Sequence, residues 1–244
     1  MIDFALKYQA VIFAPLEDIT PSPDTLKYFI DEFKDKELIP SMFQEITPSG
    51  VKNRFILKST DDEWNIEFGL NRLDIKKVNR DIFVINFGTK EEFINEVLNI
   101  LNVIFVKFPH KANRISFVTQ YFCKSFEDER LNKIALNVAN LPKTFRLSPP
   151  INWNHRYVSR IVNEINGLNE LTNFIGEINR VQGNLKIKSK IEKFDRIELK
   201  FDINTYQGNQ DYRFYLEDFK DFYSKVVQWE DNLLTEFINL VESL

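Results

Sequence analysis

The chain has 244 residues, of which 43% are hydrophobic and 28% are charged. These shares are those of a globular protein, so they exclude disorder, a collagen-like repeat and a coiled-coil rod as descriptions of the whole chain, and the length suits one large domain or two small ones. With 36 acidic and 32 basic side chains the net charge is -4, which argues against a general nucleic-acid binder.

The compartment is predicted from the single cysteine and from the distribution of apolar residues. Cys123 cannot form an internal disulfide, and an oxidising compartment would expose a lone thiol to pairing between molecules. The richest apolar segment, 97–108, is interrupted by Asn99, Asn102 and Lys107 and is shorter than the ~18 apolar residues that span a bilayer. We therefore expect a cytoplasmic protein with no membrane segment.

The first expected helix starts at Ser22, whose hydroxyl can cap the first turn, and Pro23 follows at a position where a missing N–H costs nothing. Its apolar residues have the spacing of one helical stripe: Leu26, Phe29, Ile30 and Phe33. From residue 41 to 87 apolar and polar residues alternate in short runs, the last at 83–87, and turn residues separate the runs. This region is predicted to form consecutive antiparallel strands.

A second helix is expected after Thr89, which stands three residues before Glu92 in the spacing of a capping box. Residues 113–123 then alternate as a strand does, and a shorter helix is expected from 126 to 138. The segment 141–154 contains three residues that fit neither a helix interior nor a central strand: Pro142, Pro149 and Pro150. We therefore place a connector between two halves there.

The second half repeats the order of strands followed by a helix. Strands are expected at 156–165, 171–181, 185–191 and 196–205, with turns at Asn166-Gly167 and at Gln182-Gly183-Asn184. Apolar residues recur at helical spacing from 212 to 241, which predicts a long C-terminal helix. The sequence thus predicts an α+β protein with antiparallel sheets backed by helices, in two similar halves, 1–140 and 155–244, joined by the connector 141–154.

Six segments follow one another in a recognisable order: 11–15, Arg54-Phe55-Ile56-Leu57, Trp64-Asn65-Ile66, the helix from Glu91, Leu199-Lys200-Phe201-Asp202-Ile203, and the helix from Leu216 to Trp229. Together they resemble an uncharacterised, sporadically distributed bacterial family of proteins of about this length. The resemblance covers most of the chain and implies a fold, but it assigns no activity and no catalytic residue. The patchy distribution implies a bacterial setting such as phage defence.

Common catalytic motifs are missing from the sequence. There is no G-x-S-x-G, no G-x-x-x-x-G-K-[ST], no G-x-G-x-x-G and no H-E-x-x-H. The two histidines, His110 and His155, together with Cys123 cannot supply the four ligands at paired spacing that structural zinc needs. We therefore assign no catalytic residue, metal or cofactor, and we expect Cys123 to be a small buried side chain.

One enzyme class stays open as an alternative, a metal-dependent nuclease or phosphoesterase. Asp195, Glu198 and Lys200 are close in the sequence, and carboxylates beside a lysine can hold Mg²⁺ and a water next to a phosphate. The pattern has low specificity, because a second Glu-x-Lys triplet occurs at Glu32-Phe33-Lys34 and the composition accounts for both by chance.

Positive charge is concentrated between residues 180 and 200, which carry seven basic and three acidic side chains. The basic residues nearest one another are Arg180, Lys186, Lys188, Lys190, Lys193 and Arg196. On a single strand, the lysines at 186, 188 and 190 would all project from one face. That face would bind an anionic partner, either nucleic-acid phosphate or an acidic protein surface, or it would be a solvated face whose lysines discourage edge-to-edge aggregation.

A second candidate site lies at the connector. Trp153, His155 and Arg156 follow two consecutive prolines, and ligand sites favour domain junctions, so these residues are a candidate pocket between the halves. In the alternative interpretation Trp153 packs between the halves while His155 and Arg156 face solvent.

The function that these observations favour is a non-enzymatic protein-interaction or sensing component of a bacterial cytoplasmic system. The alternatives are the metal-dependent enzyme and a nucleic-acid-binding module that uses the basic strand. We expect a protein partner, and apolar residues exposed on the C-terminal helix would also favour a homodimer.

Overall fold

The computed structural model describes residues 1–48, 50–80, 87–138, 141–187 and 190–242, with the backbone alone at 185–187 and 190–192. Nine strands of these residues form one antiparallel sheet with the order β2-β3-β4-β5-β1-β6-β9-β8-β7. The strands are β1 (Ile2–Phe13), β2 (Ile39–Thr47), β3 (Gly50–Lys58), β4 (Trp64–Phe68), β5 (Leu73–Val78), β6 (Arg114–Cys123), β7 (Trp153–Ile165), β8 (Leu168–Ile187) and β9 (Lys190–Thr205).

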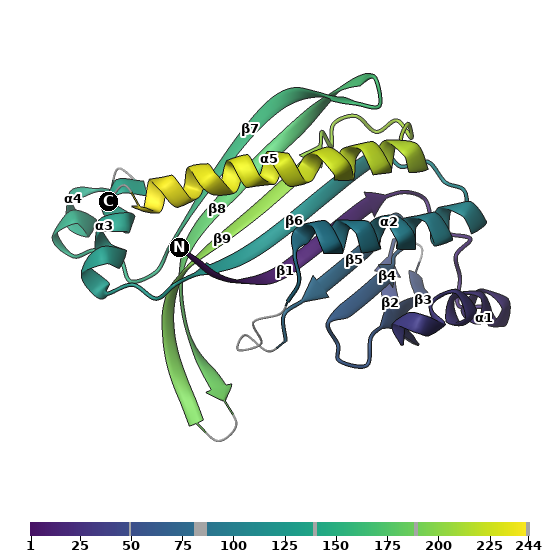
Figure 1. Ribbon diagram of the computed structural model, residues 1–244, viewed down its shortest axis with the longest axis horizontal. Helices are drawn as coiled ribbons and strands as arrows, with labels where there is room; N and C mark the ends of the chain where they lie inside the picture. The colour runs from purple at the N-terminus through teal and green to yellow at the C-terminus, as the bar shows by residue number, and fades with distance from the viewer. Residues whose placement is uncertain (49, 81–86, 139–140, 188–189, 243–244) are drawn as a thin grey trace.

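Two long helices, α2 (Lys90–Lys107) and α5 (Leu216–Glu242), lie side by side on one face of the sheet (Figure 1). The described residues also form α1 (Pro23–Glu32), η1 (Lys34–Lys36), α3 (Asp128–Val138) and α4 (Lys143–Leu147). The predicted α+β class with a long C-terminal helix is confirmed. In the part of the chain that the structure describes, none of the helices has the length and apolar character that crossing a membrane requires.

Local signals in the sequence explain where α1 and α2 begin. The Ser22 hydroxyl accepts a hydrogen bond from the Thr25 amide at 3.2 Å, as an N-cap does. Thr89 and Glu92 form the predicted capping box, each side chain accepting a hydrogen bond from the other residue's amide. These side chains satisfy amides that the helix leaves without a partner, so both helix starts are fixed locally.

The order of elements repeats within the single sheet. A first strand is followed by a helix, a run of antiparallel strands and a long helix, first from β1 to α2 and then from β6 to α5. In each unit the first strand pairs with the last one, β1 with β5 and β6 with β9, and β1 and β6 pair with each other at the centre. By this order β3, β4, β5 and α2 of the first unit correspond to β7, β8, β9 and α5 of the second.

The repeat does not divide the chain at the prolines. The second unit begins at Arg114, the first residue of β6, so the segment 141–154 lies inside it, between β6 and β7. The two units also share one sheet where separate sheets were expected, because β1 of the first unit pairs with β6 of the second, and β6 pairs with β9 across the segment 141–154. Prolines interrupt regular structure, but such an interruption does not separate strands that pair over a long sequence distance.

The β8–β9 hairpin turns later than predicted. Gln182-Gly183-Asn184 lies inside β8, which continues to Ile187 and pairs there with Lys190 of β9. The Asn166-Gly167 turn forms as predicted, with φ angles of 48° and 79° that asparagine and glycine tolerate best. Of the predicted strand at 83–87, residues 83–86 lie outside the described residues.

A buried ionic contact joins the two units through their long helices. Lys90, at the start of α2, forms an ion pair with Glu230 of α5, and the hydroxyl of Thr119 in β6 donates to Glu230 at 2.9 Å. Glu230 is fully buried and Lys90 nearly so. Burial alone lowers the pKa of Lys90, but the charges and hydrogen bonds of Glu230 and Asp231 outweigh burial and raise this pKa, so Lys90 remains charged.

Candidate partner-binding groove

The residues of the nuclease alternative do not converge in the structure. Side chains alternate along β9, so Asp195 lies on one face of the sheet and Glu198 and Lys200 on the other. Asp195 accepts hydrogen bonds from Arg180 and Gln182, and both interactions lower the pKa of its carboxyl. Within the described residues there is no group of three His, Cys, Asp or Glu side chains that could hold a metal ion.

Glu198 and Lys200 are also engaged with neighbouring strands. Glu198 accepts hydrogen bonds from Gln120 at 2.6 Å and Asn179 at 2.9 Å, and Lys200 lies 3.8 Å from a carboxylate oxygen of Glu177. These contacts belong to a network of polar side chains on the sheet face opposite α2 and α5. The geometry therefore gives no support to a nuclease centre at these residues.

The predicted basic strand is divided by the hairpin. Lys186 lies on β8 and Lys190 on β9, and Lys188 lies outside the described residues, so the argument that three lysines share one strand and one face is wrong. Arg180 is only 4% exposed and binds Asp195 and Asp128, so it is a structural residue. Lys193 is exposed, which agrees with either interpretation of the basic residues.

The candidate pocket at the connector does not form from its three residues. All three lie on β7, but Trp153 and His155 lie on one face of the strand and Arg156 on the other. Trp153 is buried with its ring centroid 5.7 Å from that of His155, and partial burial lowers the pKa of the histidine. Arg156 lies 3.3 Å from Glu177.

Cys123 is a buried core residue, as predicted. It is fully buried at the end of β6, and burial raises the pKa of its thiol to about 12. A thiol with so high a pKa is protonated at neutral pH and therefore a poor nucleophile.

The structure instead presents an open groove between the β7–β8 hairpin and α5, with a volume of about 710 Å³. Its apolar lining comes mainly from Tyr157 and Ile161 of β7, Phe174 of β8, and Trp229, Leu233 and Phe237 of α5. Its polar lining comes from Ser159, Asn163, Asn232 and Glu236. We call this hollow the β7–α5 groove.

The groove is open because β7 has little covering it. Side chains on both faces of this strand are exposed, including Tyr157 and Ile161 on the groove side and Val158 and Val162 on the other. β7 is also the last of the described strands at its end of the sheet, so one edge of its backbone has no neighbouring strand among them. An exposed, apolar strand at a sheet edge is a surface on which other chains readily bind.

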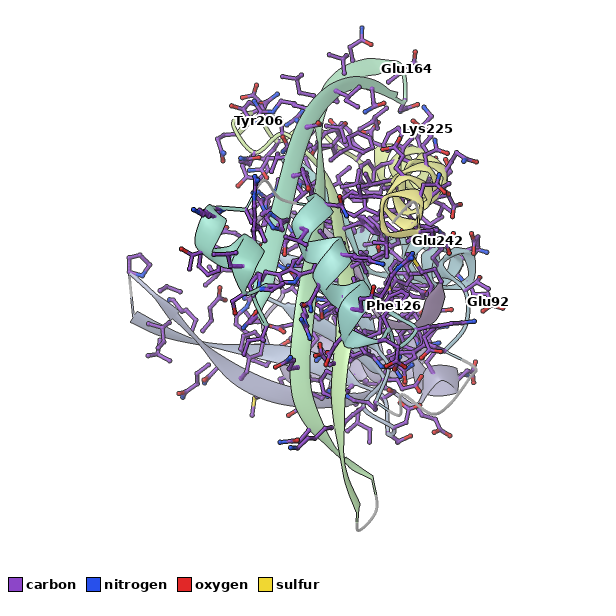
Figure 2. All side chains as sticks on the ribbon, turned by 90° about the vertical axis from the view of Figure 1, so that its left-hand side faces the viewer. Glu92, Phe126, Glu164, Tyr206, Lys225 and Glu242 are labelled. Carbon is purple, nitrogen blue, oxygen red and sulfur yellow. The ribbon has the colours of Figure 1, made fainter. Side chains whose placement is uncertain are left out.

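One end of the groove is fixed by contacts between the hairpin tip and the first half of α5. The Lys225 amine donates to the backbone oxygen of Glu164 at 2.9 Å, both labelled in Figure 2, and the Asn166 amide donates to the Asp221 carboxylate at 2.6 Å. At the other end the Tyr157 hydroxyl donates to the backbone oxygen of Val138 in α3 at 3.0 Å. The two walls are therefore held in place before any partner binds.

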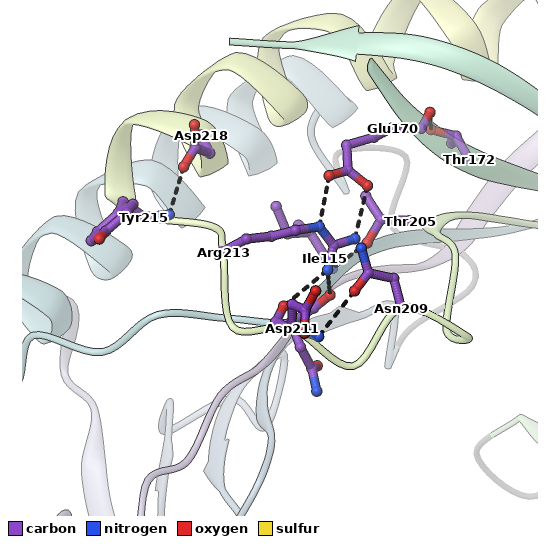
Figure 3. Close-up of polar contacts among 10 residues, drawn as sticks. Ile115, Glu170, Thr172, Thr205, Asn209, Asp211, Arg213, Tyr215 and Asp218 are labelled. Carbon is purple, nitrogen blue, oxygen red and sulfur yellow. Dashed lines mark hydrogen bonds and ion pairs between the residues drawn. The ribbon is translucent and has the colours of Figure 1, made fainter. Parts of the chain in front are cut away.

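A partly buried arginine fixes β8 to the loop that leads into α5. Arg213 donates two hydrogen bonds to the carboxylate of Glu170 in β8, at 2.6 and 2.8 Å, and two more to the backbone oxygens of Asn113 and Asp211 (Figure 3). The backbone N–H of Tyr215, just before α5, donates a hydrogen bond to the carboxylate of Asp218 in the first turn, which caps the start of the helix. A bidentate pair of this kind is rigid, so it positions β8 and α5 relative to each other.

The wall of the groove contains a hydrogen-bond donor without a partner. Nδ2 of Asn163 is buried and has no hydrogen-bond partner among the described residues. A buried donor without an acceptor is costly, and because this atom has almost no exposed surface, its missing partner is a feature of the groove wall and not a contact point for a bound molecule.

The premise of the predicted homodimer is wrong. Over its full length, which the structure describes, α5 exposes no large apolar side chain, because its apolar residues face the sheet, α2 or the groove. Its exposed positions are polar, among them Gln228, Asn232 and Glu236. Exposed apolar side chains of the second unit lie instead on β7 and β8, and also outside them at Leu147 and Ile151.

A scan of the chain against protein-family models finds no match, and a search of curated proteins finds none either. The resemblance to a sporadic bacterial family, and with it the phage-defence setting, therefore stays a prediction. The groove itself was not predicted from the sequence. A signal for it was present, since Tyr157-Val158 and Ile161-Val162 place apolar residues on both faces of a strand that is otherwise polar.

Proposed function

We propose that this protein is a non-enzymatic interaction component and that its partner protein binds in the β7–α5 groove. The observation that supports this proposal is an apolar hollow of about 710 Å³ whose rim residues, Tyr157 and Ile161, are about half exposed. Exposed apolar surface of this kind marks sites where proteins associate, because its burial removes apolar area from water.

The shape of the groove favours a macromolecular partner over a small molecule. Small-molecule sites bury most of the ligand in a concave pocket. Here exposed apolar side chains of β7 extend beyond the hollow, since Val158 and Val162 lie on the other face of this edge strand and are also exposed. A partner chain that covered the hollow and the strand would bury all of these side chains.

The proposal is tested with a partner captured from the native host, identified and then purified. Ile161→Glu places a charge on the groove rim at a side chain that is 50% exposed, so the protein still folds while the affinity for the partner falls at least about tenfold. The matched control is Ile46→Glu on β2, at the opposite end of the sheet, where the side chain is 86% exposed. If calorimetry gave the same affinity of the partner for the unmodified chain and for both variants, the proposal would be contradicted.

A further inference from the structure

The two units of the fold differ in what lies beside their long helix. In the first unit α1 fills the angle between α2 and the strands β3 and β4. The Phe29 ring centroid lies 5.3 Å from that of Phe55 in β3 and 5.1 Å from that of Phe68 in β4. The Tyr28 hydroxyl donates to the backbone oxygen of Val103 in α2 at 3.0 Å. The described residues of the first unit therefore leave no open groove at this place, because an amphipathic helix occupies it.

The β7–α5 groove is the equivalent place in the second unit. Its walls are β7, β8 and the second half of α5, which correspond in element order to β3, β4 and the second half of α2. The helix α3 follows β6 as α1 follows β1, but it lies past the C-terminal end of α5 (Figure 1). Arg130 of α3 donates there to the backbone oxygen of Val241 at 2.9 Å. Among the residues that the structure describes, the second unit thus has the walls of a helix-binding site without a helix of its own in it.

We infer that the groove binds an amphipathic helix of the partner protein, in the position that α1 holds in the first unit. This inference rests on the proposed function and names the kind of segment that docks. Helices bind such grooves through apolar residues at i, i+3 or i+4 and i+7, the spacing of Leu26 and Phe29 in α1 and Phe33 at its C-cap. Tyr157 of β7 and Phe174 of β8 offer aromatic side chains from the strands that correspond to β3 and β4, where Phe55 and Phe68 contact α1.

The charge of the groove walls indicates which charge the bound helix should carry on the side that faces α5. α5 carries seven acidic and two basic side chains, and Glu236 lines the groove while being exposed to solvent. The facing wall on β7 offers the neutral Ser159 and Asn163. The first unit shows the same complementarity, because Lys36, just after α1, lies 2.5 Å from Glu96 of α2. A helix with lysine or arginine on the side that faces α5 fits this groove best.

The probe for this inference is a synthetic peptide with the sequence of residues 21–36, labelled for fluorescence anisotropy. It carries Asp31→Lys and Glu32→Lys to make one flank basic, and a second peptide also carries Phe29→Ser and Phe33→Ser to remove the apolar stripe. With the full chain at low salt, the first peptide is expected to bind at least about tenfold more tightly than the second and to gain helical circular dichroism. Ile161→Glu in the protein is expected to abolish this difference.

Charge reversal in the protein provides the specific control. Glu236→Lys is expected to lower the affinity of the basic peptide about two- to fivefold and to raise the affinity of the unmodified 21–36 peptide. A change of this size is typical of an exposed ion pair. Glu217→Lys makes the same charge change on α5 outside the groove lining and is expected to leave both affinities unchanged. The inference would be overturned if the peptide affinity did not change with the substitutions at Ile161 and Glu236, or if the bound peptide gained no helix.

The captured natural partner separates this inference from the proposed function. If binding of the partner depends on Ile161 and cross-linking maps the bound segment to a helix, the proposed function and the helix inference are both supported. If binding depends on Ile161 but the segment pairs as an extended strand with β7, or if the occupant is a second copy of this chain, the helix inference is overturned. If binding does not depend on Ile161, the proposed function fails as well.

Discussion

The ring of Phe237 in α5 lies directly against the backbone of Gly176 in β8, so closely that a β-carbon at this glycine would overlap the ring. The contact sets the depth of the β7–α5 groove, because both residues belong to its lining. Glycine is required here by a neighbouring ring and not by its backbone angles, since Gly176 is not among the residues with positive φ.

Gly176→Ala is expected to destabilise the protein by about 1–3 kcal/mol, since it adds a methyl group where the core has no space. Denaturant unfolding measures this change. Phe237→Ala removes the ring, so in that background the same glycine substitution should cost clearly less. Equal costs in both backgrounds would show that the ring does not limit this position.

The ion pair between Lys90 and Glu230 is expected to stabilise the arrangement of the two units mainly because neither charge can be left alone. Lys90→Met leaves a buried carboxylate without its cation and should lower the free energy of unfolding by about 3–5 kcal/mol. The double variant Lys90→Met, Glu230→Leu removes both charges and should recover much of this loss. A double variant as unstable as the single one would contradict this account of the pair.

The protein is expected to lose stability at alkaline pH. Burial raises the pKa of the Tyr121 and Tyr223 hydroxyls well above their ordinary value, and burial raises the pKa of the Cys123 thiol to about 12. Groups whose pKa is raised by folding give stability that is complete below their unfolded values, about pH 9 for the thiol and about pH 10 for tyrosine, and is lost as the pH rises further. Urea unfolding between pH 7 and pH 11 measures the fall. Tyr121→Phe keeps the ring but removes the titrating hydroxyl, so its stability should fall less steeply.

Arg180 is expected to act in folding and not in binding an anionic partner. Arg180→Ala removes hydrogen bonds to Asp195, Asp128 and Asn132 from a nearly buried site and should cost about 1–3 kcal/mol of stability. Lys193→Ala, at an exposed position of the same hairpin, is the control and should change stability by less than about 0.5 kcal/mol. Similar thermal stabilities for the two variants would contradict this assignment.

Local signals in the sequence were sufficient to predict most elements of the fold. Ser22 and Thr89 cap helices where predicted, and alternation of apolar residues located β3, β4 and β6, because these features depend on neighbours in the chain. The sharing of one sheet by both units was not predicted, since it depends on the pairing of β1 with β6 over a long sequence distance. Gln182-Gly183-Asn184 has turn composition, yet it lies in a ladder in which Gln182 pairs with Asp195.

The candidate site was less predictable because its residues come from three separate elements. Ile161, Phe174 and Leu233 meet only after the sheet has formed and α5 has packed on it. The sequence does show apolar residues on both faces of β7, but that pattern is also typical of a buried central strand. Only the order of strands, with β7 last, distinguishes the two cases.

The most direct test of the central claim is hydrogen exchange of the full chain with and without the captured, purified partner. We predict slower exchange of backbone amides in 157–163 of β7 and 229–240 of α5 when the partner is bound, with unchanged exchange in 39–47 of β2. Protection confined to β2 or to the β8–β9 hairpin, with no change along β7 and α5, would contradict the assignment of the groove as the partner-binding site.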